Sequence, residues 1–329
     1  MLRVKIAGLG WYLPERRVTN AQLAEQLGIS AAWIERVTGV YERRYITTET
    51  SLSMAAAAAQ MALADARLHV RDLDAIICAS SAPVQAIPCT AALLQRAIAA
   101  PDGASACFDV NATCLSFLFA LQTAAHLVAA NVYQTVLLCS SEAASLSLNP
   151  AEHESVALFG DAAAAAVITR SPADENSTIW HALFETHSSG ADLTQLLGGG
   201  TLHHPNNPTT TPEMNMFHMR GPAVFKQGLA LVEPFVERFF STLGWERGQV
   251  DAVVPHQASR HAIEVIIRKL GFDRNQVINA LALRGNCVSA SLPLTLAESV
   301  HNGTIKRGDR VVLLGTGAGL TLGALALTF

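Results

Sequence analysis

The chain lacks several features that would place it in common classes of protein. Only 15% of its 329 residues are charged and the net charge is -4, so we expect no basic stripe that could bind nucleic-acid phosphates. No apolar run reaches the roughly 20 residues of a membrane-spanning helix. Residues 1–8 lack the charged, apolar and small-residue segments of a secretory signal. These absences predict a soluble, cytoplasmic protein without a nucleic-acid or membrane partner.

Metal-binding patterns are also missing. The six cysteines lie mostly inside apolar runs and show no close pairing of the kind that holds a metal ion. We therefore expect reduced thiols, of which one or two react chemically. The adjacent histidines His203 and His204 have no third ligand at a helical or short-loop spacing, so we expect no metal site there.

Apolar segments are abundant and alternate between two patterns. Half of the residues are hydrophobic, which provides enough apolar surface for a large core. Strand-like runs at 74–80, 105–110 and 135–140 alternate with helical patterns that begin after Pro88 and near residue 115. This order predicts an α/β fold with right-handed crossovers.

The second half of the sequence repeats the first. Residues 73–78 match residues 250–255, and residues 136–139 match residues 312–315 at almost the same separation. We therefore predict two related βα halves, 1–172 and 173–329, joined near residues 170–176.

Cys114 lies between an apolar run that ends near Val110 and a helical pattern. Unpaired N–H groups and the dipole at a helix N-terminus favour thiolate over thiol, which would suit a nucleophile. A buried structural cysteine is the alternative, because free cysteine is among the most buried residue types.

Two further stretches carry polar side chains at positions where chemistry is common. His256 follows an apolar strand, and catalytic groups of open α/β sheets collect at such strand ends. Asn286 follows Gly285 just before a helix rich in small residues. Taken singly, the histidine could bind a backbone carbonyl and the asparagine could form a turn.

Together these stretches resemble the β-ketoacyl-acyl-carrier-protein synthase III family of thiolase-fold condensing enzymes. The motifs are Asp109-Val110-Asn111-Ala112-Thr113-Cys114, Pro255-His256-Gln257-Ala258, Gly285-Asn286 with Ala290-Ser291-Leu292-Pro293, and the glycine-rich closing run 315–323. The similarity covers essentially the whole chain. It implies a five-layer αβαβα thiolase fold built from two duplicated halves. The first half would carry Cys114 and the second half His256 and Asn286. The resemblance also implies a homodimer.

The resemblance also implies an activity. The Cys114 thiolate would attack an acyl thioester while the backbone N–H groups of Cys114 and Ala318 hold the oxyanion. His256 and Asn286 would then donate hydrogen bonds to malonyl-acyl-carrier protein as it loses carbon dioxide. The 3-oxoacyl product would start a fatty acid or polyketide-type chain. No metal or redox cofactor is required, because a thioester already stabilises an adjacent carbanion. Coenzyme A or carrier-protein thioesters would be the substrates.

Several family positions for binding coenzyme A are altered. Trp33 is present, but the arginine four residues later is Val37, and Arg36 is the candidate substitute. Phe225 and Lys226 are retained. Fewer cations near the nucleotide phosphates would weaken coenzyme A binding, so the donor is either an unusual acyl-CoA or a carrier-bound acyl group.

Other family positions differ as well. Ser259 and His261 replace an asparagine and an arginine, and His153 replaces a further arginine. Ile87 stands where relatives often have a phenylalanine that limits the acyl pocket from across the dimer, which favours a primer other than acetyl.

Three functions are compatible with the sequence. The first is the decarboxylating condensation. The second is transfer of the acyl group from Cys114 to a hydroxyl or amine without decarboxylation. The third is a non-catalytic partner subunit, against which the joint presence of Cys114, His256 and Asn286 argues. A carrier protein would need a basic surface, for which Arg220, Lys226 and Arg260 are candidates.

Overall fold

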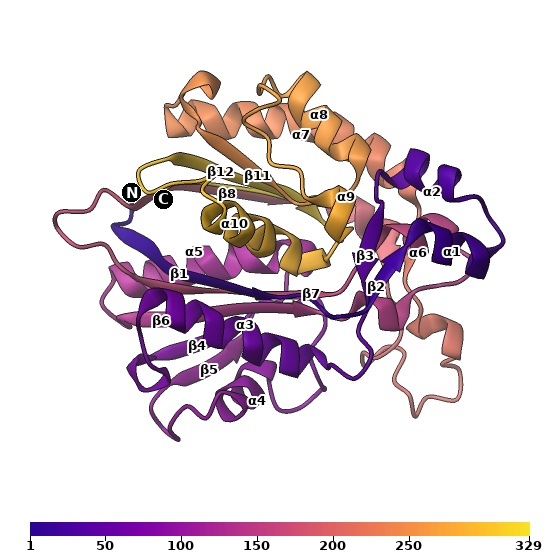
Figure 1. Ribbon diagram of the computed structural model, residues 1–329, viewed down its shortest axis with the longest axis horizontal. Helices are drawn as coiled ribbons and strands as arrows, with labels where there is room; N and C mark the ends of the chain where they lie inside the picture. Colours follow the sequence, from indigo (N-terminus) through magenta and orange to yellow (C-terminus); the bar gives the residue numbers. More distant parts are fainter.

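The fold has five layers in the order helices, sheet, helices, sheet, helices (Figure 1), in a computed structural model that describes residues 1–329. Helices α5 (Ser116–Ala129) and α10 (Ser291–His301) lie between the two sheets. The outer layers are formed by α3 (Ser51–Ala66) with α4 (Thr90–Ala97), and by α7 (Gly221–Leu243) with α8 (Arg260–Lys269). The predicted α/β, five-layer αβαβα fold is confirmed.

The first sheet has five strands in the order β1-β7-β6-β4-β5. β4 runs parallel to β5 and β6, and β7 runs antiparallel to β6 and β1. Small residues let helices pack closely on both faces: residues 162–166 of β7 are consecutive buried alanines, and a Cβ at Gly10 of β1 would lie 2.3 Å from the Ala58 carbonyl oxygen of α3. The strands are β1 (Val4–Tyr12), β4 (Ala75–Cys78), β5 (Ala106–Asp109), β6 (Thr135–Glu142) and β7 (Ala162–Arg170).

The second sheet has four strands in the order β11-β12-β13-β8. β11 is parallel to β12, and the other pairings are antiparallel. The strands are β8 (Thr178–Thr186), β11 (Ala252–Pro255), β12 (Arg310–Gly317) and β13 (Thr321–Thr328). Because the first sheet ends at Arg170 and the second begins at Thr178, we propose the 172/173 boundary as the junction of the two halves.

The sheet pairings correct the register of the sequence repeat. In the first sheet Ala75 pairs with Val136, whereas in the second the equivalent Ala252 pairs with Val311. The match of residues 136–139 to residues 312–315 was therefore wrong by one position. Successive valines and leucines in β12 fit either register by composition, and only the pairing with β11 selects one.

Smaller elements form a lobe beside the layers and a surface segment. The lobe contains β2 (Arg17–Thr19), α1 (Asn20–Leu27), α2 (Ala31–Thr38), β3 (Glu42–Arg44) and α6 (His153–Leu158). The side chains of Thr19 and Ser30 cap α1 and α2. The irregular segment after residue 188 contains β9 (Thr194–Gln195), which pairs with β10 (His218–Met219). A further short helix, α9 (Leu281–Arg284), lies just before Asn286. None of the helices has both the length and the apolar character needed to cross a membrane.

Candidate active site

Cys114 lies in a single 3-10 turn, η2 (Thr113–Leu115), directly before α5. The turn requires a positive φ of 52° at Thr113. Two hydrogen bonds stabilise it: the Thr113 N–H donates to Asn111 Oδ1 at 2.9 Å, and the Ala112 N–H donates to Ser116 Oγ at 2.9 Å. Cys114 is half-buried, whereas Leu115 beside it is fully buried and anchors the turn in the core.

The end of β12 passes directly beneath this turn. A Cβ at Gly317 would lie 3.0 Å from Thr113 Oγ1, and a Cβ at Gly315 would lie 2.8 Å from the Cβ of His256 and 3.0 Å from the Leu115 side chain. Only glycine permits this approach from both sides. The glycine-rich closing run thus brings the Cys114 turn and His256 together on one strand end.

Burial raises the pKa of the Cys114 thiol to about 12. Hydrogen bonds from the backbone N–H groups of Ala318 and of Cys114 itself lower this pKa, and the negative charge of Glu142 raises it. The expected thiolate at a helix N-terminus is therefore wrong for the free enzyme, because desolvation outweighs the local N–H groups. The two N–H groups are nevertheless those expected for the oxyanion hole.

His256 follows β11 and is 4% exposed. The backbone N–H of His256 donates to the carbonyl oxygen of Leu314 at 2.8 Å, which fixes the His256 backbone beside β12. Burial lowers the pKa of the imidazole to about 4, so the ring is neutral near pH 7. Nδ1 has no hydrogen-bond partner in the protein. A neutral ring offers one donor and one acceptor nitrogen, as a residue that exchanges a proton requires.

Asn286 is held next to the His256 loop. Its N–H donates to the Leu158 carbonyl oxygen at 2.9 Å, and its side-chain Nδ2 lies 3.4 Å from the Ala258 carbonyl oxygen. Gly285 has a φ of 66°, and a Cβ there would lie 2.5 Å from the Leu158 oxygen, so glycine is sterically required directly before Asn286.

The loop that carries Asn286 is a second copy of the Cys114 turn. Val288 has a φ of 50° and donates to Asn286 Oδ1 at 2.9 Å, and the Cys287 N–H donates to Ser291 Oγ at 2.9 Å. The 3-10 turn η7 (Val288–Ala290) follows and leads into α10. Ser289 therefore occupies the position that Cys114 occupies in the first turn. The sequence analysis missed this correspondence, although Asn111 lies three residues before Cys114 and Asn286 lies three residues before Ser289.

A buried glutamate near both turns was also missed. Glu142 ends β6 and accepts hydrogen bonds from Ser81 and Ser289. Its position at the end of an apolar strand was the available signal, the same signal that identified His256.

The residues predicted to bind the donor lie at the ends of three helices. Trp33 and the exposed Arg36 belong to α2, and Phe225 and Lys226 belong to the first turns of α7. Ser259 caps α8, where its hydroxyl accepts the Ala262 N–H at 3.2 Å.

Two contacts join these helix ends. The Phe225 ring meets the His261 ring of α8 edge-on at 6.0 Å, and a Cβ at Gly39, after α2, would lie 3.0 Å from the Arg260 side chain. Ile87 lies elsewhere, before α4, and is 83% exposed in the single chain.

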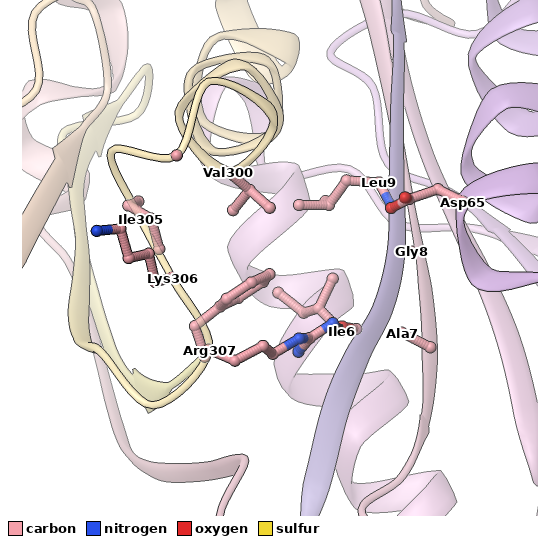
Figure 2. A pocket seen from close by; sticks show the side chains of 11 residues that line it. Ile6, Ala7, Gly8, Leu9, Asp65, Val300, Ile305, Lys306 and Arg307 are labelled. Carbon is pink, nitrogen blue, oxygen red and sulfur yellow. Dashed lines mark hydrogen bonds between the residues drawn. The ribbon is translucent and has the colours of Figure 1, made fainter.

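A separate cavity of about 420 Å³ opens between β1 and the loop from α10 to β12 (Figure 2). Arg307 crosses it, donates to the Ile6 carbonyl oxygen at 2.7 Å and stacks on the Phe329 ring at 4.1 Å. None of the predicted site residues lines this cavity.

Comparison with known proteins gives one consistent result. The family models described as 3-oxoacyl-[acyl-carrier-protein] synthase III and its C-terminal part match residues 108–188 and 240–329. The chain is 34% identical to a β-ketoacyl-[acyl-carrier-protein] synthase III of Bartonella bacilliformis, with 99% of each chain covered. It is 35% identical to the protein of that name from Rhodospirillum rubrum, with 98% of each covered.

Solved structures agree with the sequence matches. The 3-oxoacyl-[acyl-carrier-protein] synthase III of Aquifex aeolicus superposes with a TM-score of 0.89 at 32% identity, covering 99% of this chain and 100% of that one. A priming β-ketosynthase from the R1128 polyketide pathway gives 0.90 at 27% identity, covering 98% and 95%. The family expected from the motifs is thus confirmed: the chain belongs to the 3-oxoacyl-[acyl-carrier-protein] synthase III family of acyltransferases, the thiolase-fold condensing enzymes.

Proposed function

We propose that the chain transfers an acyl group from a thioester to Cys114 and then condenses it with malonyl-acyl-carrier protein, with loss of carbon dioxide. The observation that carries this proposal is the convergence of Cys114, His256 and the Asn286 loop around the end of β12, with the Ala318 N–H at the Cys114 sulfur. The product is a 3-oxoacyl thioester that starts a fatty acid or polyketide-type chain.

In the first step, Cys114 Sγ attacks the thioester carbonyl carbon and its proton passes to neutral His256. The Cys114 and Ala318 N–H groups stabilise the oxyanion. The C–S bond to the donor then breaks, and the departing thiolate takes the proton from His256. Because the thiol has a pKa of about 12, proton transfer accompanies the attack and no stable thiolate precedes it.

In the second step, His256 and Asn286 Nδ2 donate hydrogen bonds to the carbonyl oxygen of the malonyl thioester. Its C–C bond to the carboxylate breaks, carbon dioxide leaves, and the electron pair becomes an enolate. The enolate carbon attacks the acyl thioester on Cys114, whose sulfur leaves as a thiolate and takes up a proton from solvent water. Two donors on one oxygen are what an enolate requires, since its charge is concentrated there.

We further propose that Trp33, Arg36, Phe225, Lys226 and Ser259 receive the thioester donor. In support, the Phe225 ring of α7 meets His261 of α8, and Gly39, directly after α2, lies against the Arg260 side chain of α8. Arg36 and Lys226 are exposed cations suited to a phosphate, and the carrier protein's acidic surface is the alternative partner of the same charges.

We also propose a homodimer that pairs the first sheets of two chains. β5 is an edge strand of its sheet, so one row of its backbone N–H and C=O groups has no strand partner within the chain. Ile87, 83% exposed, would reach the acyl pocket of the partner subunit.

The direct test is to incubate the protein with a panel of acyl-CoAs and acyl-carrier proteins and to measure the mass added to each cysteine. We expect acylation of Cys114 by at least one member of the panel, and none in Cys114→Ala. Acylation of the alanine variant would overturn the nucleophile assignment. Acyl-enzyme that is stable to malonyl-acyl-carrier protein but discharged by an alcohol or amine would favour the transfer reaction without decarboxylation.

A further inference from the structure

Glu142 is a buried carboxylate that the proposed mechanism does not use. It is 3% exposed and accepts hydrogen bonds from the Ser81 N–H at 2.6 Å, from Ser81 Oγ at 2.7 Å and from Ser289 Oγ. It takes part in none of the ion pairs of the molecule. Burying a carboxylate without a cation is unfavourable, and groups buried at such a cost concentrate at functional sites.

The duplication explains where this carboxylate sits. β6 and β12 are equivalent strands, and their pairings make Glu142 the counterpart of Gly317. The Cys114 turn packs on Gly317, and Ser289, the counterpart of Cys114, bonds to Glu142. One turn thus carries a thiol beside backbone N–H groups, while its copy carries a hydroxyl beside a carboxylate.

Glu142 also connects the two turns through hydrogen bonds. Ser81, which donates twice to Glu142, accepts at its carbonyl oxygen the Asn111 Nδ2 of the Cys114 turn at 2.9 Å. Ser289 follows Asn286 by three residues on the other side. A continuous path therefore leads from the Cys114 turn through Ser81, Glu142 and Ser289 to the Asn286 loop.

We propose that Glu142 is a positioning residue for the condensation: through Ser81 and Ser289 it holds the Asn286 loop against the Cys114 turn, and its buried carboxylate places a negative charge between the two turns. The positioning half rests on the proposed function, and the charge half does not. Burial is the main reason that the pKa values of Cys114 and Cys287 are raised, and the Glu142 charge raises both further. Burial also raises the pKa of Glu142 itself, whereas the hydrogen bonds from Ser289 and Ser81 lower it and so favour the carboxylate. Neighbouring His256 is neutral near pH 7, so it does not offset the charge.

The charge is tested by alkylating Cys114 at pH 8 with neutral iodoacetamide and anionic iodoacetate. Glu142→Gln keeps the side-chain shape and removes the charge. We expect iodoacetamide to react at least about three-fold faster, since one pKa unit is a factor of about ten, and iodoacetate to gain more than iodoacetamide does. A site that is merely looser would react faster with both reagents equally.

Asp161→Asn is the matched control. Asp161 is also fully buried and also accepts from a serine, Ser145, and from backbone N–H groups, but it does not act on the Cys114 pKa. We expect its iodoacetate-to-iodoacetamide ratio to equal that of the wild type.

Positioning is tested by Glu142→Asp, which keeps the charge but shortens the side chain. Ser289→Ala is the second variant: it leaves Glu142 unchanged and removes one of its hydrogen bonds, so it remains usable if the glutamate variants fail to fold. We expect each to slow decarboxylation of malonyl-acyl-carrier protein at least about ten-fold while acyl loading of Cys114 changes less than about three-fold. The proposal is overturned if Glu142→Gln leaves the reagent ratio unchanged, or if Ser289→Ala decarboxylates at the wild-type rate. A wild type that does not decarboxylate at all would instead refute the proposed function, and the alkylation experiment would still decide the charge.

Discussion

Cys114 and His256 form an uncharged pair in the free protein. Burial holds the thiol protonated, with a pKa of about 12, and the imidazole deprotonated, with a pKa of about 4. Charge then develops only during the attack, next to N–H groups that already face the sulfur. Fixed donors of this kind are worth most in a site that excludes water, because they need not reorganise.

The neutral thiol predicts the pH dependence of Cys114 alkylation. Because its pKa is raised to about 12, the thiolate fraction grows about ten-fold per pH unit throughout the neutral and mildly alkaline range. We expect the iodoacetamide rate of the wild type to rise continuously from pH 7 to pH 10. Mass spectrometry of the Cys114 peptide measures it, with Cys114→Ala as the blank. A plateau below pH 8 would show a preformed thiolate.

The donor role of Asn286 is separable from its structural role. Asn286→Asp retains the oxygen that accepts the Val288 N–H but loses the Nδ2 donor. We expect decarboxylation to fall about 100-fold or more, the effect of removing one oxyanion donor, while acyl loading of Cys114 continues. Thermal stability should also fall, because the substitution buries a carboxylate beside the Ala258 carbonyl oxygen. Wild-type rates of carbon dioxide release in this variant would refute the assignment.

At the scale of elements, the site consists of two copies of one turn against two strand ends. The first turn presents Cys114 above glycines of β12, and the second presents Asn286 and Ser289 beside β6. Glycine at 315 and 317 is therefore required by close approach of the chain, and not by a turn.

Gly315→Ala tests this close approach. Its Cβ would lie 2.8 Å from that of His256, so we expect a destabilisation of about 1–3 kcal/mol and loss of condensation. Gly228→Ala, in α7, is the control, because nothing lies within 4 Å of its Cβ and alanine favours a helix. Chemical denaturation measures both. Equal stability of the two variants would contradict the packing argument.

Much of the fold and part of the site could be predicted from the sequence. The alternation of apolar strands with alanine-rich helices predicted the α/β fold, because buried parallel strands are apolar throughout, whereas the five layers were implied by the family resemblance. The strand register of β12 could not be predicted, since Val311 and Val312 fit equally well. The Cys114 pKa and the link from Glu142 to Ser289 also escaped prediction, because both depend on burial and contacts between segments far apart in the chain.

At the scale of the whole molecule, β5 forms a free edge of the first sheet. The exposed Ile87 lies shortly before α4, which packs on β5. An exposed strand edge with an apolar residue nearby is a surface that proteins usually cover. A second copy of the chain would extend the sheet and bury both.

Ile87→Asp tests this assembly. We expect the wild type to sediment as a species of twice the 34.9 kDa chain mass, and the variant to dissociate at least about ten-fold more readily, because the substitution would bury a carboxylate without a cation in each partner subunit. Val132→Asp, at a position 57% exposed after α5, should leave the assembly unchanged. A wild-type monomer at micromolar concentration would contradict the proposed dimer.

The central claim, condensation by Cys114, His256 and Asn286, is tested most directly by one single-turnover measurement. Acyl-enzyme prepared at Cys114 is mixed with malonyl-acyl-carrier protein labelled in its free carboxyl group, and labelled carbon dioxide and 3-oxoacyl product are quantified together. We predict one equivalent of each per acyl-Cys114, with the acyl mass lost from the enzyme. Acyl-Cys114 that persists while no labelled carbon dioxide appears would contradict the claim.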